Sequence, residues 1–213
     1  LFRSEDVRLD QRLMQFFKLI NQHVSHEFNV ESRSMRIFRY SITPLTKDSG
    51  LIQFVDGADT MFSLISDYRK ARMPDIFIEN KLMNNIAKPN IDTLMSIQRC
   101  EVLLEVIEKT SDTDLREELW LTSPSSREWV FRSIRFVQSN SLMSIIGYIL
   151  GLGDRHPSNL MIHRYTGSII HIDFSDCFEI SKNRMLFPEL IPFRLTRMML
   201  KAFGVNGIEG DFR

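Results

Sequence analysis

Two polar residues at the ends of a short strand pair have the types and spacing to hold a metal ion. Residues 160–162 and 169–172 are aliphatic runs that flank a polar segment with one glycine, and this pattern predicts a β-hairpin. Because neighbouring strands lie roughly 5 Å apart, Asn159 before the first strand and Asp173 after the second are expected to converge. An amide oxygen and a carboxylate are Mg²⁺ ligands that need further oxygens, which phosphates supply best. Both are also common turn and capping residues, so the spacing alone leaves a structural role open.

A further aspartate and a histidine precede this hairpin. Asp154 lies five positions before Asn159, and the order of an Asp, four residues, an Asn and a strand pair ending in Asp-Phe resembles the phosphoryl-transfer site of protein kinases. The triplet at residues 154–156 reads Asp-Arg-His instead of His-Arg-Asp. This reversal resembles the phosphatidylinositol-3-kinase-related protein kinases and their lipid-kinase relatives. Within them, the block at residues 147–161 is most similar to the target-of-rapamycin (TOR) type.

The resemblance implies a role for each polar residue of the site. Asp154 is expected to accept or orient the proton of the substrate hydroxyl, and His156 is expected to orient or stabilise the phosphoryl group in transfer. Asn159 and Asp173 are expected to hold Mg²⁺ or Mn²⁺ on the phosphates of ATP. Without the resemblance, an isolated histidine such as His156 is more typical of a satisfied structural side chain.

The composition is that of an ordinary globular chain with balanced charge. Of its 213 residues, 43% are hydrophobic and 25% are charged, and 27 Lys and Arg offset 27 Asp and Glu, so no nucleic-acid partner is expected. The weakly polar run at 142–153 is shorter than the roughly 20 residues of a transmembrane helix, so it is expected to be a buried core helix and no transmembrane segment is expected. Cys100 and Cys177 lack metal-ligand spacing, which favours a reducing, cytoplasmic location, with a membrane-associated complex or a nuclear pool left open.

Hydrophobic periodicity predicts a helix and a strand pair followed mainly by helices. Strands are expected at residues 35–45 and 51–55, joined by a turn at 48–50, and residues 56–59 are expected to break the pattern. Residues 173–194 contain two prolines and little periodicity, so a long loop is expected there. Helices are predicted at residues 10–24, 60–71, 92–109, 125–137 with a capping box of Ser125 and Glu128, 139–150, and 195–203 with Gly204 as the C-terminal cap.

These elements and the resemblance predict an α+β fold, namely a two-lobed protein-kinase-like fold of the PI3K/PI4K type with a truncated small lobe and a mostly helical large lobe. Residues 1–55 are expected to be the C-terminal part of the small lobe, and residues 56–213 the large lobe with the catalytic loop, the metal-binding loop and the activation segment. The chain then crosses between lobes at Phe54 and Val55, where backbone groups are expected to hydrogen-bond adenine. By resemblance these residues belong to the nucleotide pocket, although Phe54 stands where the family more commonly has Trp. Three further residues are expected to form apolar walls around the base: Tyr40, Met161 and Ile172.

Two positions depart from the family pattern. Phe2 stands where ungapped matching places the phosphate-contacting lysine, and Ser175 stands where the family has a glycine after Asp-Phe. A Cβ at position 175 restricts left-handed backbone conformations, so it is expected to alter the movement of the loop while leaving Asp173 intact. Glu5 and Asp10 match an acidic segment of the family, whose functional role is to pair with that lysine. Their alternative role is a solvated helix start.

The leading interpretation is the catalytic portion of a Ser/Thr protein kinase of the TOR type, which transfers the γ-phosphate of ATP to protein hydroxyls in growth and nutrient signalling. A phosphoinositide lipid kinase is the first alternative. Such enzymes need basic residues in the activation loop, where this chain has only Lys182 and Arg184 against Asp176, Glu179 and Glu189. A pseudokinase scaffold is the second alternative, because the phosphate-contacting lysine is missing from its expected position.

The resemblance also implies partners. The stretch between the first large-lobe helix and Ser123 resembles the TOR insertion that docks a WD40-propeller subunit. Membership of a larger TOR-type complex that acts on protein substrates is therefore expected.

Overall fold

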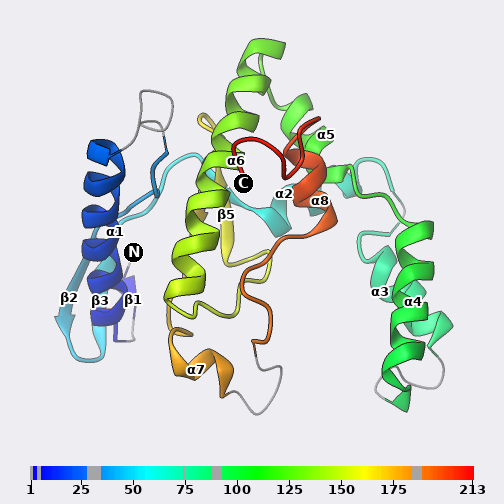
Figure 1. The fold of residues 1–213 in the computed structure, drawn as a ribbon, viewed down its shortest axis with the longest axis horizontal. Coiled ribbons are helices and arrows are strands. Elements are labelled where there is room, and N and C mark those ends of the chain that lie inside the picture. The colour runs from blue at the N-terminus through cyan, green and yellow to red at the C-terminus, as the bar shows by residue number, and fades with distance from the viewer. Residues whose placement is uncertain (1, 4–5, 28–34, 74, 88–92, 184–188) are drawn as a thin grey trace.

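The computed structural model combines small antiparallel sheets with a mainly helical body (Figure 1). This α+β composition confirms the predicted fold class. The structure describes residues 2–3, 6–27, 35–73, 75–87, 93–183 and 189–213.

The N-terminal part is a helix beside a three-stranded antiparallel sheet. Helix α1 spans Arg8–Glu27 and confirms the predicted helix, although it begins earlier and ends later. The strands are β1 (Phe2–Arg3), β2 (Ile42–Thr46) and β3 (Ser49–Ile52), in the order β1-β3-β2. The predicted hairpin of β2 and β3 is therefore confirmed, and β1 adds a third strand to its edge.

The prediction of a strand at residues 35–45 extends too far toward the N-terminus, because β2 begins only at Ile42. In the first half of the predicted range, the backbone of Ile37 bonds to a side chain and not to another strand. The backbone N of Ile37 donates to Oδ1 of Asn21 (2.8 Å), and Nδ2 of Asn21 donates to the carbonyl of Ile37 (2.9 Å). A side-chain amide thus satisfies the peptide groups that a ladder would otherwise pair. Residues 35–41 run without strand structure, and the second strand likewise ends at Ile52, short of the expected residue 55.

A second sheet contains the predicted hairpin whose two ends carry Asn159 and Asp173. It comprises β4 (Ala58–Thr60), β5 (Leu160–His163) and β6 (Ile169–His171), in the order β4-β5-β6. The hairpin of β5 and β6 is confirmed. The expectation that residues 56–59 only break the pattern is wrong, because β5 is the central strand and Thr60 of β4 pairs opposite Met161 on its second edge.

Helices form most of the remaining chain. Helix α2 (Met61–Lys70) confirms the prediction, and the hydroxyl of Thr60 caps it by accepting from the backbone N of Ser63 (3.0 Å). A short helix lies within residues 173–194, so the expectation of an uninterrupted loop there is wrong. Gly204, which follows the last helix, has the left-handed φ of a C-terminal cap (+87°), as predicted. The other helices are α3 (Ile78–Ile86), α4 (Ser96–Lys109), α5 (Asp114–Leu121), α7 (Glu179–Lys182) and α8 (Arg197–Ala202).

The central helix α6 spans Ser126–Ile149, so the two separate helices predicted at 125–137 and 139–150 are one. Its start is as predicted, with Oγ of Ser125 accepting from the backbone N of Glu128 (3.3 Å). The polar residues at the expected break do not interrupt the helix. Oγ of Ser139 donates to the carbonyl of Arg135 (2.7 Å) and accepts from the backbone N of Ile169 (2.9 Å), so a buried hydroxyl joins α6 to β6.

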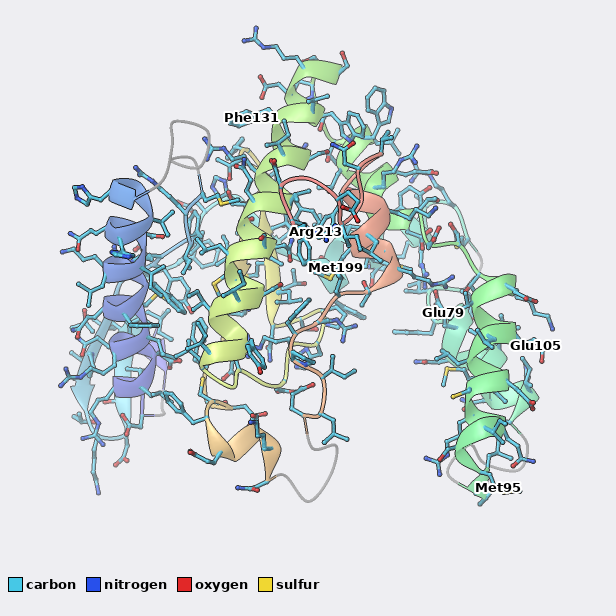
Figure 2. All side chains as sticks on the ribbon, viewed as in Figure 1. Glu79, Met95, Glu105, Phe131, Met199 and Arg213 are labelled. Atoms are coloured by element: carbon cyan, nitrogen blue, oxygen red, sulfur yellow. The ribbon has the colours of Figure 1, made fainter. Side chains whose placement is uncertain are left out.

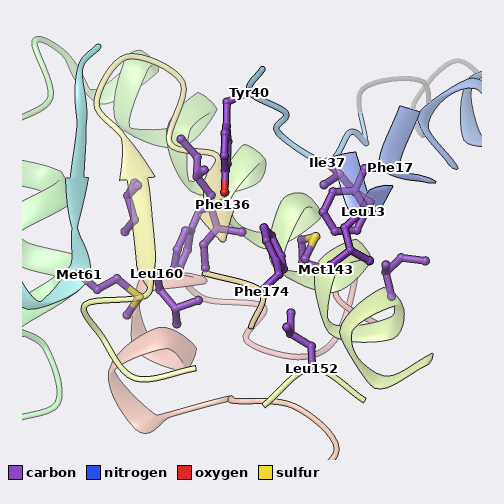
Figure 3. Packing of buried hydrophobic residues seen from close by; sticks show 14 of the residues in the cluster. Leu13, Phe17, Ile37, Tyr40, Met61, Phe136, Met143, Leu152, Leu160 and Phe174 are labelled. Carbon is purple, nitrogen blue, oxygen red and sulfur yellow. The ribbon is translucent and has the colours of Figure 1, made fainter. Parts of the chain in front are cut away.

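The buried core gathers around α6 and the β5–β6 hairpin (Figure 3). Phe136 of α6 and Phe174 after β6 are fully buried, and Phe174 meets Phe17 of α1 edge to face at 5.6 Å between ring centroids. The core therefore holds the segment after β6 against both α1 and α6. No helix in the described part of the chain combines the length and the apolar character needed to cross a membrane.

Helices α3 and α4 project from the body as an arm, with Met95 at the far end of α4 (Figure 2). The base of this arm is an ion-pair cluster around the buried Arg69 of α2. Its Nε donates to Asp114 (2.6 Å) and its Nη2 to Glu79 of α3 (2.5 Å). Arg197, the first residue of α8, donates from Nη1 to the carbonyl of Thr110 at the end of α4 (3.0 Å). The arm is thereby fastened to α2, α5 and α8.

Candidate active site

The loop between α6 and β5 has a backbone path that requires a glycine at its start. Gly151 has φ +57°, and a Cβ there would lie 3.0 Å from the carbonyl oxygen of Phe178. The backbone N of Phe178 in turn donates to the carbonyl of Leu150 (2.8 Å). Asp154 further along also has positive φ (+56°), a conformation that non-glycine residues rarely adopt. The loop is thus held tightly where it meets the segment before α7.

Asn159 connects the loop to the end of the hairpin. Its Nδ2 donates to the carbonyl of Asp154 (2.9 Å) and approaches Oδ2 of Asp154 (3.5 Å). The carbonyl of Asn159 accepts from the backbone N of Ile172 (3.1 Å), the residue before Asp173. The structure therefore brings Asp154, Asn159 and Asp173 to one end of the hairpin, and Oδ1 of Asn159 has no protein donor in the part of the chain described here.

Arg155 is the residue that sequence reasoning missed, although it stands inside the Asp-Arg-His triplet. Its buried guanidinium donates from Nε to the carbonyl of Gly153 (2.7 Å), from Nη1 to that of Ile172 (2.8 Å), and from Nη2 to that of Asp173. Burial lowers the pKa of this guanidinium from its usual value. A planar fork with several donors is suited to this task, and here it ties the loop to the segment after β6.

Asp173 has a left-handed backbone (φ +59°), whereas Ser175 does not. The restriction that a Cβ places on left-handed conformations is therefore not encountered at position 175 in this conformation, and the expected effect on loop movement stays a prediction. The consequence of Ser175 is a hydrogen bond, because its Oγ donates to Oδ1 of Asp173 (2.8 Å) and its backbone N lies 3.3 Å from the same oxygen. The departure from the family pattern thus acts directly on the carboxylate.

Asp10 of α1 is buried and holds the same segment from the opposite side. Its Oδ1 accepts from the backbone N of Phe174 (3.2 Å), across a separation of 164 residues. This contact corrects the interpretation of Asp10 as a solvated helix start, because the carboxylate faces the protein interior. The other acidic residue of that motif, Glu5, and the side chain of Phe2 lie outside the described residues.

His156 lies at the surface beside Asp154. Its Nε2 is 3.9 Å from Oδ2 of Asp154, and its side chain is 50% exposed. The backbone N of Ser158 donates to Nδ1 of His156 (3.2 Å), which orients the ring. The exposed edge of the imidazole is therefore available to a reactant next to Asp154.

The five residues expected around a nucleotide differ in their burial. Tyr40 is buried, and its hydroxyl donates to the carbonyl of His171 (3.4 Å). Val55, Met161 and Ile172 are partly buried against the same core cluster. Phe54 instead has 73% of its surface exposed. The structure thus buries Tyr40, packs Val55, Met161 and Ile172 against the core cluster, and leaves Phe54 exposed at the surface.

A cavity of about 770 Å³ opens beside Asp154 and His156. Its opposite wall is formed by the segment from Glu189 to Thr196, which leads into α8. The space is large enough for a peptide side chain to reach the carboxylate of Asp154, and Leu152 adds an apolar surface.

The sequence model of the phosphatidylinositol 3- and 4-kinase family matches residues 1–213, the whole chain. The chain therefore belongs to this family. The kinase-like motif lies in the loop between α6 and β5 and at the ends of the β5–β6 hairpin, next to the cavity.

Among named relatives, the chain is similar to TOR kinases. It is 50% identical over 209 residues to the serine/threonine-protein kinase TOR of Arabidopsis thaliana, which covers 98% of this chain and 8% of that protein. It is 34% identical over 243 residues to the serine/threonine-protein kinase SMG1 of Danio rerio, covering 100% of this chain and 7% of that protein. The solved FAT and kinase domain of CtTel1 superposes with a TM-score of 0.82 at 28% identity, covering 99% of this chain and 15% of that one. The chain thus spans less than a tenth of the length of these curated relatives.

Proposed function

We propose that this chain is the catalytic portion of a Ser/Thr protein kinase of the TOR type, which transfers the γ-phosphate of ATP to protein hydroxyls. The observation that carries the proposal is the set of contacts that holds three residues at one end of the hairpin. Asn159 bonds to Asp154, and Arg155 bonds to the carbonyl of Asp173. The similarity to TOR kinases supports a protein substrate over a lipid one.

Each side chain then has a distinct task. Asp154, which borders the cavity, accepts or orients the proton of the substrate hydroxyl, and His156 beside it stabilises the phosphoryl group in transfer. Asn159 offers an amide oxygen that no described residue donates to, and Asp173 offers a carboxylate, so this pair fits Mg²⁺ or Mn²⁺. Such an ion neutralises charge on the phosphates of ATP when bound. Arg155 and Asp10 are positioning residues that hold the backbone around Asp173.

The division of the chain follows from the same proposal. Residues 1–55 are the end of the small lobe and residues 56–213 the large lobe. The adenine lies between them, next to Val55, with Tyr40, Met161 and Ile172 as apolar surfaces and Phe54 at the outer edge. The half-buried positions of Val55, Met161 and Ile172 support this placement, because a ligand can cover their remaining exposed surface.

The arm of α3 and α4 is the proposed docking site of a WD40-propeller subunit within a larger TOR-type complex in the cytoplasm. Leu103 and Leu104 on α4 are 49% and 60% exposed, so the arm presents apolar surface to a partner. The ion pairs of Arg69 and Glu79 hold the arm in a defined orientation. Co-purification with a TOR-complex WD40 subunit, and its loss in the variant with Leu103→Glu and Leu104→Glu, tests this assignment.

Phosphate transfer by the purified full-length protein tests the central proposal. Radiolabelled ATP is supplied with Mg²⁺ and either a serine-containing peptide or vesicles that contain phosphatidylinositol. We expect label on the peptide, and a loss of about 100-fold or more in Asp154→Asn. Asp173→Asn is expected to lose activity and to need more Mg²⁺. Asp67→Asn, a change at an exposed aspartate paired with Lys70, is the matched control.

Other outcomes of this assay contradict the proposal in distinct ways. Label on phosphatidylinositol and none on peptide identifies a lipid kinase. No transfer to either acceptor identifies a pseudokinase, in which the phosphate-contacting lysine has been lost without replacement. Equal activity of the wild type and Asp154→Asn removes Asp154 from the reaction.

A further inference from the structure

An open groove lies between α1 and α6, and the described residues that line it all differ from those that line the cavity beside Asp154. Its volume is about 560 Å³. One side comes from Asn21 of α1 and the extended residues 36–39, and the other from α6 and the β5–β6 turn. Phe131, labelled in Figure 2, lies on the α6 side. The groove is therefore a feature separate from the candidate active site.

The charged side chains among the described lining residues are all arginines. Arg36 and Arg39 come from the extended segment, and Arg135 comes from α6. No aspartate or glutamate is among the lining residues that the structure describes. Because the whole chain has equal numbers of basic and acidic residues, 27 of each, this groove is a local excess of positive charge.

The arginines of the extended segment keep most of their donors available. Arg39 donates from Nε to the carbonyl of Met14 (2.9 Å), which orients its guanidinium, and neither terminal nitrogen has an acceptor among the described residues. Arg36 is exposed and makes no hydrogen bond or ion pair with the described part of the chain. Across the groove, Cζ of Arg135 lies 5.3 Å from the ring centroid of Phe131, and this contact holds the side chain along α6.

The uncharged polar groups around the arginines already serve the fold. The amide of Asn21 is engaged at both of its polar atoms by the backbone of Ile37. The hydroxyl of Ser139 accepts from the backbone N of Ile169. A ligand in the groove therefore meets guanidinium groups as its main donors, and planar guanidinium forks match the oxygens of a phosphate group.

From this arrangement we propose that the groove binds a phosphate-bearing ligand through Arg36, Arg39 and Arg135. Arg39 is oriented in advance by its bond to Met14, and Arg135 by its contact with Phe131. Arg36 adds a third charge at the exposed edge. The shared chemistry is the phosphate group, which a free phosphate compound or a phosphorylated side chain can supply.

Calorimetric titration of the purified full-length protein tests this inference. Inorganic pyrophosphate represents the free compound and a phosphoserine peptide the phosphorylated side chain, each in a buffer with EDTA and an ionic strength of about 0.15 M. We expect saturable binding of at least one probe, weakened about tenfold or more in the variant with Arg36→Gln and Arg39→Gln. Arg116→Gln, at an exposed arginine of α5 outside the groove, is the matched control and is expected to bind like the wild type.

Two further variants separate this site from others. Changing Arg36 and Arg39 to lysine keeps the charge but removes the planar fork that matches a phosphate group, so binding is expected to weaken several-fold. Asp173→Asn is expected to leave binding in the groove unchanged, whatever the outcome of the phosphate-transfer assay. No binding of either probe, or equal binding in the wild type and the double glutamine variant, overturns the inference.

Discussion

Replacing Arg155 by lysine is expected to loosen the segment that carries Asp173. The guanidinium reaches the carbonyls of Gly153, Ile172 and Asp173 from three different nitrogens. A lysine ends in one ammonium group, so it can keep roughly one of these bonds and two are lost. Hydrogen bonds to a charged donor contribute roughly 1.5–3 kcal/mol each, which gives a local loss of about 3–6 kcal/mol. A loss of about 3 kcal/mol from the placement of Asp173 lowers kcat about 100-fold.

Hydrogen exchange and steady-state kinetics of the full-length protein measure this effect. The backbone N–H groups of Phe174 and Phe178 are bonded to Asp10 and to the carbonyl of Leu150, so their exchange reports opening of the segment. We expect exchange at both to become about 100-fold faster in Arg155→Lys, together with the fall in kcat.

Arg164→Lys is the matched control, because Arg164 forms an exposed ion pair with Asp59. Such surface pairs contribute at most about 1 kcal/mol, so neither exchange at Phe174 nor kcat is expected to change measurably. Wild-type exchange and turnover in Arg155→Lys would refute the argument that the guanidinium holds Asp173 in place.

Three smaller predictions follow from neighbouring contacts. Ser175→Gly removes the hydroxyl bond to the Asp173 carboxylate and is expected to lower the Mg²⁺ concentration for half-maximal activity about two- to tenfold, measured by Mg²⁺ titration. Gly167→Ala places a Cβ 2.3 Å from a carbonyl oxygen of α6 and is expected to speed exchange in β5 and β6 more than Gly204→Ala, where nothing lies within 4 Å. Burial lowers the pKa of His171 from 6.5 to about 3, so as the pH falls through this range the unfolded chain takes up a proton that the folded chain does not. Stability in denaturant titrations is therefore expected to fall with acidification, and less so in His171→Gln.

Each of these predictions has a contradicting result. An unchanged Mg²⁺ requirement in the glycine variant at position 175 would show that the hydroxyl does not affect the carboxylate. Equal hydrogen exchange in β5 and β6 of the alanine variants at positions 167 and 204 would show that the backbone of α6 moves to accommodate the added methyl group. An identical pH profile in His171→Gln would assign the acid sensitivity to other groups.

The local elements were predictable from the sequence because their causes lie within a few residues. The short aliphatic runs on either side of the polar turn predicted the hairpin of β5 and β6, and the cap of α6 followed from Ser125 and Glu128. The boundaries were less predictable where a side chain from elsewhere acts on the backbone. Asn21 satisfies the peptide groups of Ile37, so the strand begins only at Ile42.

The residues of the candidate site could be proposed from the sequence, whereas the contacts that support them could not. Asp154, Asn159 and Asp173 could be selected because their order and spacing along the sequence match the kinase-like pattern. The pattern does not reveal that Arg155 bonds three carbonyls or that Ser175 bonds the Asp173 carboxylate. These contacts depend on where the backbone turns, and periodicity and composition carry no information on that.

By itself, the sequence determined which residues are candidates for phosphate chemistry and which short segments become helices and strands, because both depend on residue type and near spacing. Tertiary structure decided what holds those residues in place. Asp10 meets the backbone N of Phe174 across 164 residues, and no local pattern in either segment indicates the other. Likewise, Ser139 lies within α6 without interrupting it, and its hydroxyl bonds both to the carbonyl of Arg135 and to the backbone N of Ile169 in β6. A buried hydroxyl needs such partners, and the fold decides which groups are near enough to serve.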